Sequence, residues 1–179
     1  STNTILKLNR TKKFLTGIYP YSIMTSVFSN LEQTKPLVKT TTSIQEWCGQ
    51  AYLQLNRRGR LEVKSHSYFE GEADQNLRFK DAITEEEIWT WIRTYPKLLP
   101  IGDFEILPSL EYLQLKHKPI KLYNVKTKFD RNDSLNIYHM TYPELSRKLS
   151  IKFRVLPPFK ILGWDETDFK TVEKKKIAE

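Results

Sequence analysis

The sequence has little cysteine, little glycine and no long apolar run, and each shortage excludes a class of protein. The single cysteine, Cys48, excludes an internal disulfide and a zinc site built from cysteines. No run of about 18 apolar residues occurs, so no segment is expected to span a membrane as a helix. Six glycines are present, and none belongs to a G-x-x-x-x-G-K, G-x-G-x-x-G or G-x-S-x-G motif. Phosphate-binding loops and an α/β-hydrolase nucleophile are therefore not expected.

Histidine is also scarce, and the charge is unevenly placed. The three histidines, His66, His117 and His139, lack the close paired spacing of metal ligands, so no metal and no cofactor are expected. The net charge of +8 divides into about +7 for residues 1–64, −6 for 65–111 and +7 for 112–179. Because an acidic block interrupts the basic residues, nucleic acid is not the expected partner. Binding to nucleic acid or another anionic surface through basic patches remains an alternative.

Aromatic and β-branched residues predict a sheet. Aromatic residues make up 12% of the chain, and short alternating segments recur between turn-forming residues. The expected fold class is α+β and β-dominated, a strongly curved antiparallel sheet or half-barrel with one main helix. The segments expected to be strands are 5–8, 110–117, 120–129, 134–142, 147–155 and 159–164, and residues 16–29 form either a strand broken at Pro20 or a loop entering a short helix.

The main helix is predicted over residues 84–95. Thr84 and Glu87 have the spacing of a capping box, and Ile88 begins an apolar stripe that continues at i+3, i+4 and i+7. Pro96 ends the helix. The three glutamates of its first turn are expected to be solvated.

The segment 45–72 predicts a β-hairpin. A three-residue loop, Arg57-Arg58-Gly59, keeps the apolar residues of both strands on one face. This register pairs Leu55 with Leu61, Leu53 with Val63 and Trp47 with Phe69.

The other face of that hairpin carries the residues of an enzymatic alternative. In the predicted register Cys48 faces Tyr68, and His66 lies one diagonal step away, with Glu70 nearby. A cysteine, a histidine and a carboxylate can together activate a thiolate nucleophile. A residue in the middle of a strand lacks the amide donors that catalysis needs, so a structural Cys48 is the preferred interpretation.

Several residues are candidates for contacts with a ligand or a partner. Phe159 and Trp164 lie in a strand after Pro157-Pro158, where an aromatic side chain either covers an apolar ligand or closes the core. The full set of candidate contacts is Trp47, Tyr68, Phe159, Trp164, Arg57, Arg58 and Arg60.

Five stretches together resemble a known family: "TKKFLTGIYPYSIM", "SIQEWCGQAYLQLN", "SYFEGEADQN", "MTYPELSRKLSIKF" and "FKILGWDE". The sequence is similar, over residues 4–168, to uncharacterised exported bacterial proteins that are commonly predicted to be lipoproteins. Some members carry the label "septum formation inhibitor Maf", but the S-x-S-P-R-R-type loop of true Maf pyrophosphatases is missing here. The resemblance implies a β-rich protein of the cell envelope, in the periplasm or attached to the outer membrane, with a possible lipid anchor outside this chain. It implies no catalytic residues.

These patterns lead to one expectation. Residues 1–168 are expected to form a single β-rich domain, whose relatives have further strands before it, and residues 169–179 a charged tail. The expected role is non-enzymatic binding of a lipid or other hydrophobic ligand, or of a protein partner in the envelope.

Overall fold

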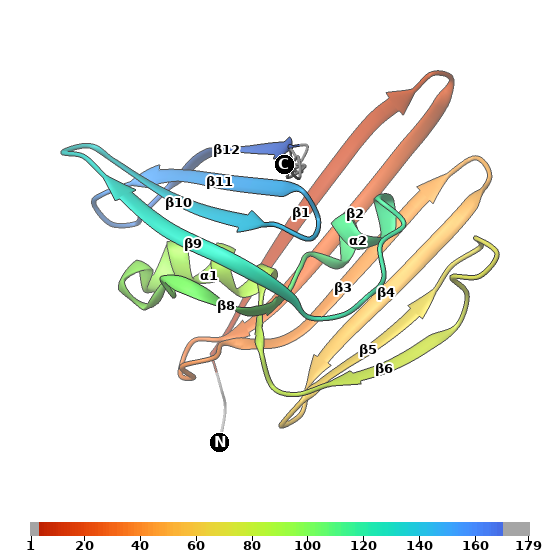
Figure 1. Ribbon diagram of the computed structural model, residues 1–179, viewed down its shortest axis with the longest axis horizontal. Coiled ribbons are helices and arrows are strands. Elements are labelled where there is room, and N and C mark those ends of the chain that lie inside the picture. The colour runs from red at the N-terminus through yellow and green to blue at the C-terminus, as the bar shows by residue number, and fades with distance from the viewer. Residues whose placement is uncertain (1–3, 170–179) are drawn as a thin grey trace, which may run out of the picture. The chain divides into compact units, whose positions relative to one another are not determined.

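The chain forms two compact units, each made from two stretches of sequence (Figure 1). The computed structural model describes residues 4–169. Unit 1 comprises residues 1–91 and 106–122, and unit 2 comprises residues 92–105 and 123–179. The expected single domain over 1–168 stays a prediction, and residues 170–179 of the expected tail lie outside the described part of the chain.

Unit 1 contains a six-stranded antiparallel sheet whose strands follow one another in sequence order. Its strands are β1 (Ile5–Thr16), β2 (Tyr19–Asn30), β3 (Leu37–Glu46), β4 (Gly49–Arg57), β5 (Leu61–His66) and β6 (Gln75–Phe79). β1 and β6 are the outer strands of this sheet. Residues 16–29 therefore belong mainly to a strand, and Pro20 is tolerated because it is the second residue of β2, before the pairing of β2 with β3 begins at Ser22.

One face of this sheet, called here the inner face, is buried. Alternation along each strand places its apolar side chains on that face, for example Ile23, Leu53 and Val63. Leu107 and Leu110 pack into the same cluster. The inner face is thus covered by residues of the segment 107–122, and the outer face carries polar side chains together with exposed Met24 and Tyr52.

Two α-helices accompany the strands: α1 (Glu85–Thr94) and α2 (Leu110–Leu115). The prediction of a helix over 84–95 is confirmed, and the backbone N–H of Thr84 donates to Glu87 Oε2 at 2.8 Å, as a capping box requires. The prediction of a strand over 110–117 is wrong. Over only six residues, the alternation of a strand and the spacing of a helix share positions. The pattern of apolar residues therefore could not distinguish a strand from a helix here.

The hairpin of β4 and β5 keeps Leu53, Leu55, Leu61 and Val63 on one face, as predicted, but not in the predicted register. The predicted pairing of Trp47 with Phe69 is wrong, because Trp47 lies in the turn before β4 and Phe69 in the loop after β5. Leu55 lies opposite Val63, and Arg57 lies opposite Leu61, so the three-residue loop is Arg58-Gly59-Arg60. Gly59 has the expected left-handed conformation, with φ +72°. Arg57 extends β4 by one residue because its guanidinium bonds inside the unit, as described next.

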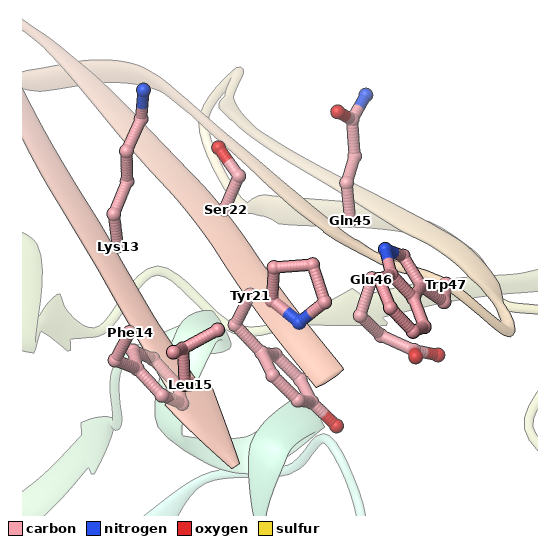
Figure 2. A pocket seen from close by; sticks show the side chains of 9 residues that line it. Lys13, Phe14, Leu15, Tyr21, Ser22, Gln45, Glu46 and Trp47 are labelled. Carbon is pink, nitrogen blue, oxygen red and sulfur yellow. The ribbon is translucent and has the colours of Figure 1, made fainter. Parts of the chain in front are cut away.

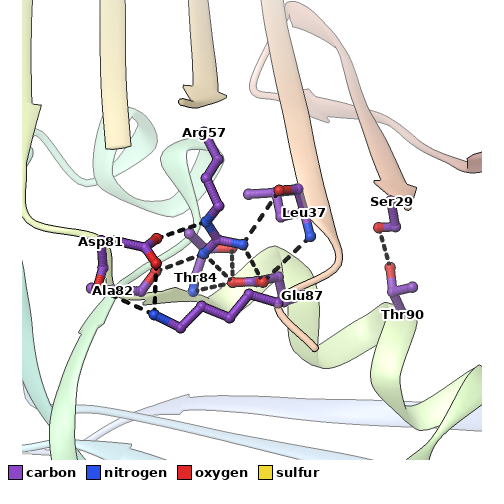
Figure 3. Close-up of polar contacts among 9 residues, drawn as sticks. Ser29, Leu37, Arg57, Asp81, Ala82, Thr84, Glu87 and Thr90 are labelled. Carbon is purple, nitrogen blue, oxygen red and sulfur yellow. Dashed lines mark hydrogen bonds and ion pairs between the residues drawn. The ribbon is translucent and has the colours of Figure 1, made fainter. Parts of the chain in front are cut away.

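Charged groups anchor the start of α1, contrary to the expectation that its glutamates are solvated. Arg57 donates from Nη2 to Glu87 Oε2 at 2.8 Å and to the carbonyl of Ala82 at 2.7 Å (Figure 3). Its Nε lies 2.9 Å from Asp81 Oδ1. Ser29 and Thr90 share a hydrogen bond of 3.1 Å. Burial lowers the pKa of Arg57, but the two carboxylates outweigh it and raise the pKa, so the guanidinium stays charged.

A row of polar side chains crosses the inner face beside this network. Arg10 lies opposite Thr25, and Thr25 opposite Thr42. Arg10 binds the buried carboxylate of Glu86. Thr25 donates to Glu111 Oε2 at 3.3 Å, whose other oxygen lies 2.6 Å from Lys12 Nζ. Helix α1 and helix α2 are thus each bonded to the sheet through a buried glutamate.

The second sheet has the strand order β12-β11-β10-β9-β8-β7 and is strongly curled into a half-barrel. Its strands are β7 (Ile83–Thr84), β8 (Gly102–Leu107), β9 (Tyr123–Arg131), β10 (Leu135–Tyr142), β11 (Arg147–Arg154) and β12 (Ile161–Asp168), and a 3-10 turn, η1, covers Pro96–Leu98. The pairs from β9 to β12 are antiparallel, whereas β7 and β8 are parallel. The β-dominated α+β class, with a half-barrel and one main helix, is therefore confirmed.

The core of unit 2 is apolar and aromatic. Val125, Tyr138, Met140, Ile151 and Phe153 are all buried. The hydroxyl of Tyr138 donates to the carbonyl of residue 100 at 2.6 Å, so its polar end is satisfied. Neither helix of the described residues 4–169 is long and apolar enough to cross a membrane.

Candidate functional site

Cys48 does not occupy the middle of a strand. It lies with Trp47 in the two-residue turn between β3 and β4, exposed to solvent. Its backbone N–H donates to Glu46 Oε2 at 2.9 Å. Desolvation and the neighbouring carboxylate of Glu46 both raise the pKa of the thiol. A raised pKa means less thiolate at neutral pH, which is the opposite of an activated nucleophile.

His66 has a different partner from the one predicted. It ends β5 opposite Tyr52, and its Nδ1 lies 2.8 Å from Asp74 Oδ1. Tyr68 packs its ring against Gly49 and donates its hydroxyl to Glu46 Oε1. The predicted pairing of Cys48 with Tyr68 on neighbouring strands is therefore wrong, since residues 67–74 form a loop.

Glu70 belongs to the same loop, which connects β5 to β6, and is exposed. The three candidates Cys48, His66 and Glu70 thus come from one turn, one strand end and one loop. No described contact joins them into the relay that a thiolate enzyme needs.

The three arginines of the predicted basic turn separate into two environments. Arg57 is buried in the network of Glu87 and Asp81. Arg58 and Arg60 are exposed, and both lie near Glu62, at 4.0 and 3.1 Å. The turn therefore presents two cations beside a carboxylate, which is a weaker attraction for an anionic surface than three arginines.

Phe159 and Trp164 lie in unit 2. Phe159 precedes β12 and is half-buried. Trp164 lies opposite Ile151 on β12, the outer strand of the half-barrel, and is half exposed. Their contact with a ligand stays a prediction.

An open groove of about 580 Å³ lies at one end of the unit 1 sheet (Figure 2). It lies between the turn that joins β1 to β2 and the turn that joins β3 to β4. The residues that line it are Lys13, Phe14, Leu15, Pro20, Tyr21, Ser22, Gln45, Glu46 and Trp47.

The groove follows from unequal strand lengths. The pairing of β1 with β2 continues to Thr16 and Tyr19, whereas the pairing of β2 with β3 ends at Ser22 and Gln45. The hairpin of β1 and β2 therefore extends past the last β2–β3 pair by three residues of β2. Trp47 stands at the end of β3, so the space beside the extension has an aromatic wall.

The walls of the groove are rich in exposed apolar surface. The rings of Phe14 and Tyr21 are stacked with centroids 5.0 Å apart, and Tyr19 meets Trp47 edge-on at 6.0 Å. Leu15 is 70% exposed and Trp47 is 67% exposed. Exposed apolar side chains that lie together in this way are typical of binding sites.

Three polar side chains of the groove lie on one side of it. In Figure 2, Lys13, Ser22 and Gln45 point to the same side, away from the rings of Phe14 and Tyr21. The register explains this, because Lys13 lies opposite Ser22 and Ser22 lies opposite Gln45. The groove thus combines an apolar wall with a row of a cation, a hydroxyl and an amide.

Most residues of this groove were not among the predicted site residues. Of the predicted contacts only Trp47 lines it. A signal was present in "KKFLTGIYPY", because apolar residues surround a turn glycine, where polar residues are usual. Gly17 has φ +61° in that turn.

Within the described part of the chain, no group of three or more histidine, cysteine, aspartate or glutamate side chains is arranged to hold a metal ion.

Comparison with known proteins gives no relative. No protein-family model matches the chain, and neither a curated protein nor a solved structure matches it significantly.

Proposed function

We propose that this is a non-enzymatic binding protein, whose unit 1 holds the apolar part of a small lipid-like ligand in the groove beside Trp47. One observation carries the proposal: an open groove of about 580 Å³ is lined by Leu15 and Pro20 on one face of the β1–β2 hairpin, by Phe14 and Tyr21 on the other face, and by Trp47 at the end of β3. This volume lies within the range of about 300–1,000 Å³ that small-molecule sites occupy.

The exposure of the wall supports the same proposal. Each buried Å² of apolar surface is worth about 25 cal/mol, so a ligand that covers exposed Leu15 and Trp47 recovers free energy that the unliganded protein lacks. The rings are already stacked or in edge contact, so little ordering is required when the ligand binds.

We place the protein in the cell envelope on the strength of the sequence resemblance alone. A lipid-binding role is compatible with that location, because amphiphiles are abundant at envelope membranes. A protein partner that inserts an apolar side chain into the groove is the competing occupant.

Tryptophan fluorescence tests the proposal with a defined probe. Decanol is titrated into the protein, and we expect a saturable change in emission because Trp47 is exposed before binding. Trp47→Phe should remove this change. Trp164→Phe is the matched control, since Trp164 is also exposed but lies in unit 2, and it should retain the change. A signal that survives Trp47→Phe and disappears in Trp164→Phe would move the site to the half-barrel, and absence of saturable binding would overturn the proposal.

A further inference from the structure

We infer that the groove selects a single-chain amphiphile with an anionic headgroup, which Lys13 binds while the chain lies against Leu15, Pro20 and Trp47. This inference rests on the proposed function and names the ligand class. It depends on a feature that apolar binding alone does not need, the polar row Lys13–Ser22–Gln45.

The row offers donors at a spacing that suits one small anionic group. The three residues lie on adjacent strands in direct register, and neighbouring strands are about 4.8 Å apart. Lysine supplies a positive charge with three donors, serine a hydroxyl and glutamine an amide. Gln45 Nε2 has one long contact, 3.5 Å from Gln50 Oε1.

The charges around the groove favour an anion on this side. Of the residues that line the groove, Lys13 and Glu46 are charged. Glu46 accepts hydrogen bonds from the N–H of Cys48 and the hydroxyl of Tyr68, which lower its pKa. In Figure 2 its carboxylate lies on the side away from Lys13. The next cation on β1, Lys12, alternates to the inner face and pairs with Glu111.

The apolar residues lie where a chain attached to that headgroup would pass. Leu15 follows Lys13 on the same side of β1, and Pro20 lies opposite Leu15 on β2. Trp47 closes the groove at the end of β3. A headgroup at Lys13 therefore places a single alkyl chain along Leu15 and Pro20 toward Trp47, and the volume of about 580 Å³ suits a single chain of small-molecule size better than a protein segment.

Three probes of equal chain length test the headgroup. Decanoate, decanol and decyltrimethylammonium are compared by isothermal titration calorimetry at pH 8 and low salt. We expect decanoate to bind about fivefold more tightly than decanol, as an exposed ion pair allows, and the cation to bind more weakly than both. In Lys13→Gln the preference for decanoate over decanol should disappear, and in Lys13→Arg it should remain.

Lys7→Gln is the matched control. Lys7 is exposed on the same face of β1, where its ammonium lies 5.3 Å from the ring of Phe28, outside the groove. Its loss removes the same charge from the same strand, so it should leave the preference for decanoate unchanged. An equal loss in both variants would mean that net charge alone attracts the anion, and the inference would be wrong.

The remaining outcomes separate the inference from the proposed function. If decanol and decanoate bind the wild-type protein equally, the headgroup inference fails while apolar binding in the groove stands. If neither binds, the proposed function fails as well. Vesicles of phosphatidylglycerol are the last probe. If the protein binds these vesicles but not monomeric decanoate, the groove binds a membrane surface and the inference is wrong.

Discussion

The two ends of the unit 1 sheet reverse the usual distribution of side chains. At the end where β4 meets the start of α1, the carboxylate of Glu87 is buried and the side chain of its partner Arg57 is only 9% exposed. At the opposite end, around the turns of β1–β2 and β3–β4, apolar Leu15, Ile18 and Trp47 are exposed. The buried charges have partners within the chain, whereas the exposed apolar groups have none among the buried residues of the core. The first end is therefore satisfied by contacts within the chain, and the second is the end at which we propose that a ligand binds.

The largest loss of stability should come from removing the ion pair at the charged end of the sheet. Arg57→Met leaves Glu87 buried without its ion pair, which costs about 3–5 kcal/mol of unfolding free energy. Arg58→Ala, one residue further along the same chain but exposed, should cost less than about 0.5 kcal/mol. Urea unfolding of both variants gives the comparison. Similar losses in both would show that Arg57 is not a structural anchor.

A second test addresses the tight contact between Gly49 and Tyr68, at the end of the sheet with exposed apolar side chains. A Cβ at Gly49 would lie 2.7 Å from Cγ of the Tyr68 ring, close to the base of that side chain, where little movement is available. Gly49→Ala should therefore cost about 1–3 kcal/mol. Gly163→Ala on β12 meets nothing within 4 Å and should be nearly neutral. Thermal unfolding distinguishes them, and an unaffected Gly49→Ala would mean that Tyr68 moves freely.

The buried carboxylate of Glu86 should make the stability of the protein depend on pH. Burial raises the pKa of Glu86 above the 4.5 of an exposed glutamate, with Arg10 acting in the opposite direction and Glu85 in the same one. The folded protein therefore holds this proton to higher pH than the unfolded chain does. Stability is lost as the pH rises from about the unfolded pKa through the folded one.

Glu86→Gln removes that titration. The stability of this variant relative to wild type should rise between pH 5 and pH 8, because wild type loses the contribution of the bound proton as Glu86 titrates. Burial raises the pKa of Asp81, but Lys35 and Arg57 outweigh burial and lower it. Asp81 therefore changes stability with pH in the opposite direction, and this contribution cancels because Asp81 is present in both proteins. Urea unfolding at the two pH values provides the measurement, and a difference that falls with pH would contradict the assignment.

The smallest effect should come from the exposed apolar end. Leu15→Ser and Ile18→Ser remove side chains that are each 70% exposed, so the free energy of unfolding should change by less than about 0.5 kcal/mol. Leu15→Ser should nevertheless weaken the binding of decanol, because Leu15 lines the groove. A loss of stability without a loss of binding would show that these residues serve folding.

Local sequence signals predicted where the helices and strands lie better than they predicted which of their side chains are buried. The capping box of Thr84 and Glu87 located α1, but nothing local indicated that Glu87 is buried, because its partner Arg57 is 30 residues away. The same long-range pair explains the error in the hairpin register. Loop length and the positive φ of Gly59 fit both placements of the loop, and the bond to Glu87 selects the one that includes Arg57 in β4.

The candidate site was largely beyond local prediction for a related reason. Cys48 and His66 were selected as candidates because of their chemistry, yet Cys48 lies in a two-residue turn and not in the strand that would have aligned them. The groove depends on where β3 ends relative to β2, which is a property of two ladders and not of any single segment. Trp47 was among the predicted contacts, although it was expected on the apolar face of a strand and lies instead in a turn.

The unequal lengths of the strands also give the groove one stiff side and one pliable side. Past Ser22, the hairpin of β1 and β2 is a ribbon of two strands, and isolated two-stranded ribbons are only marginally stable. The side formed by Trp47 continues into β3 and β4, which have neighbours on both flanks. Twisting of the ribbon can therefore change the width of the groove without disturbing the charged end, so the proposed ligand need not have one fixed thickness.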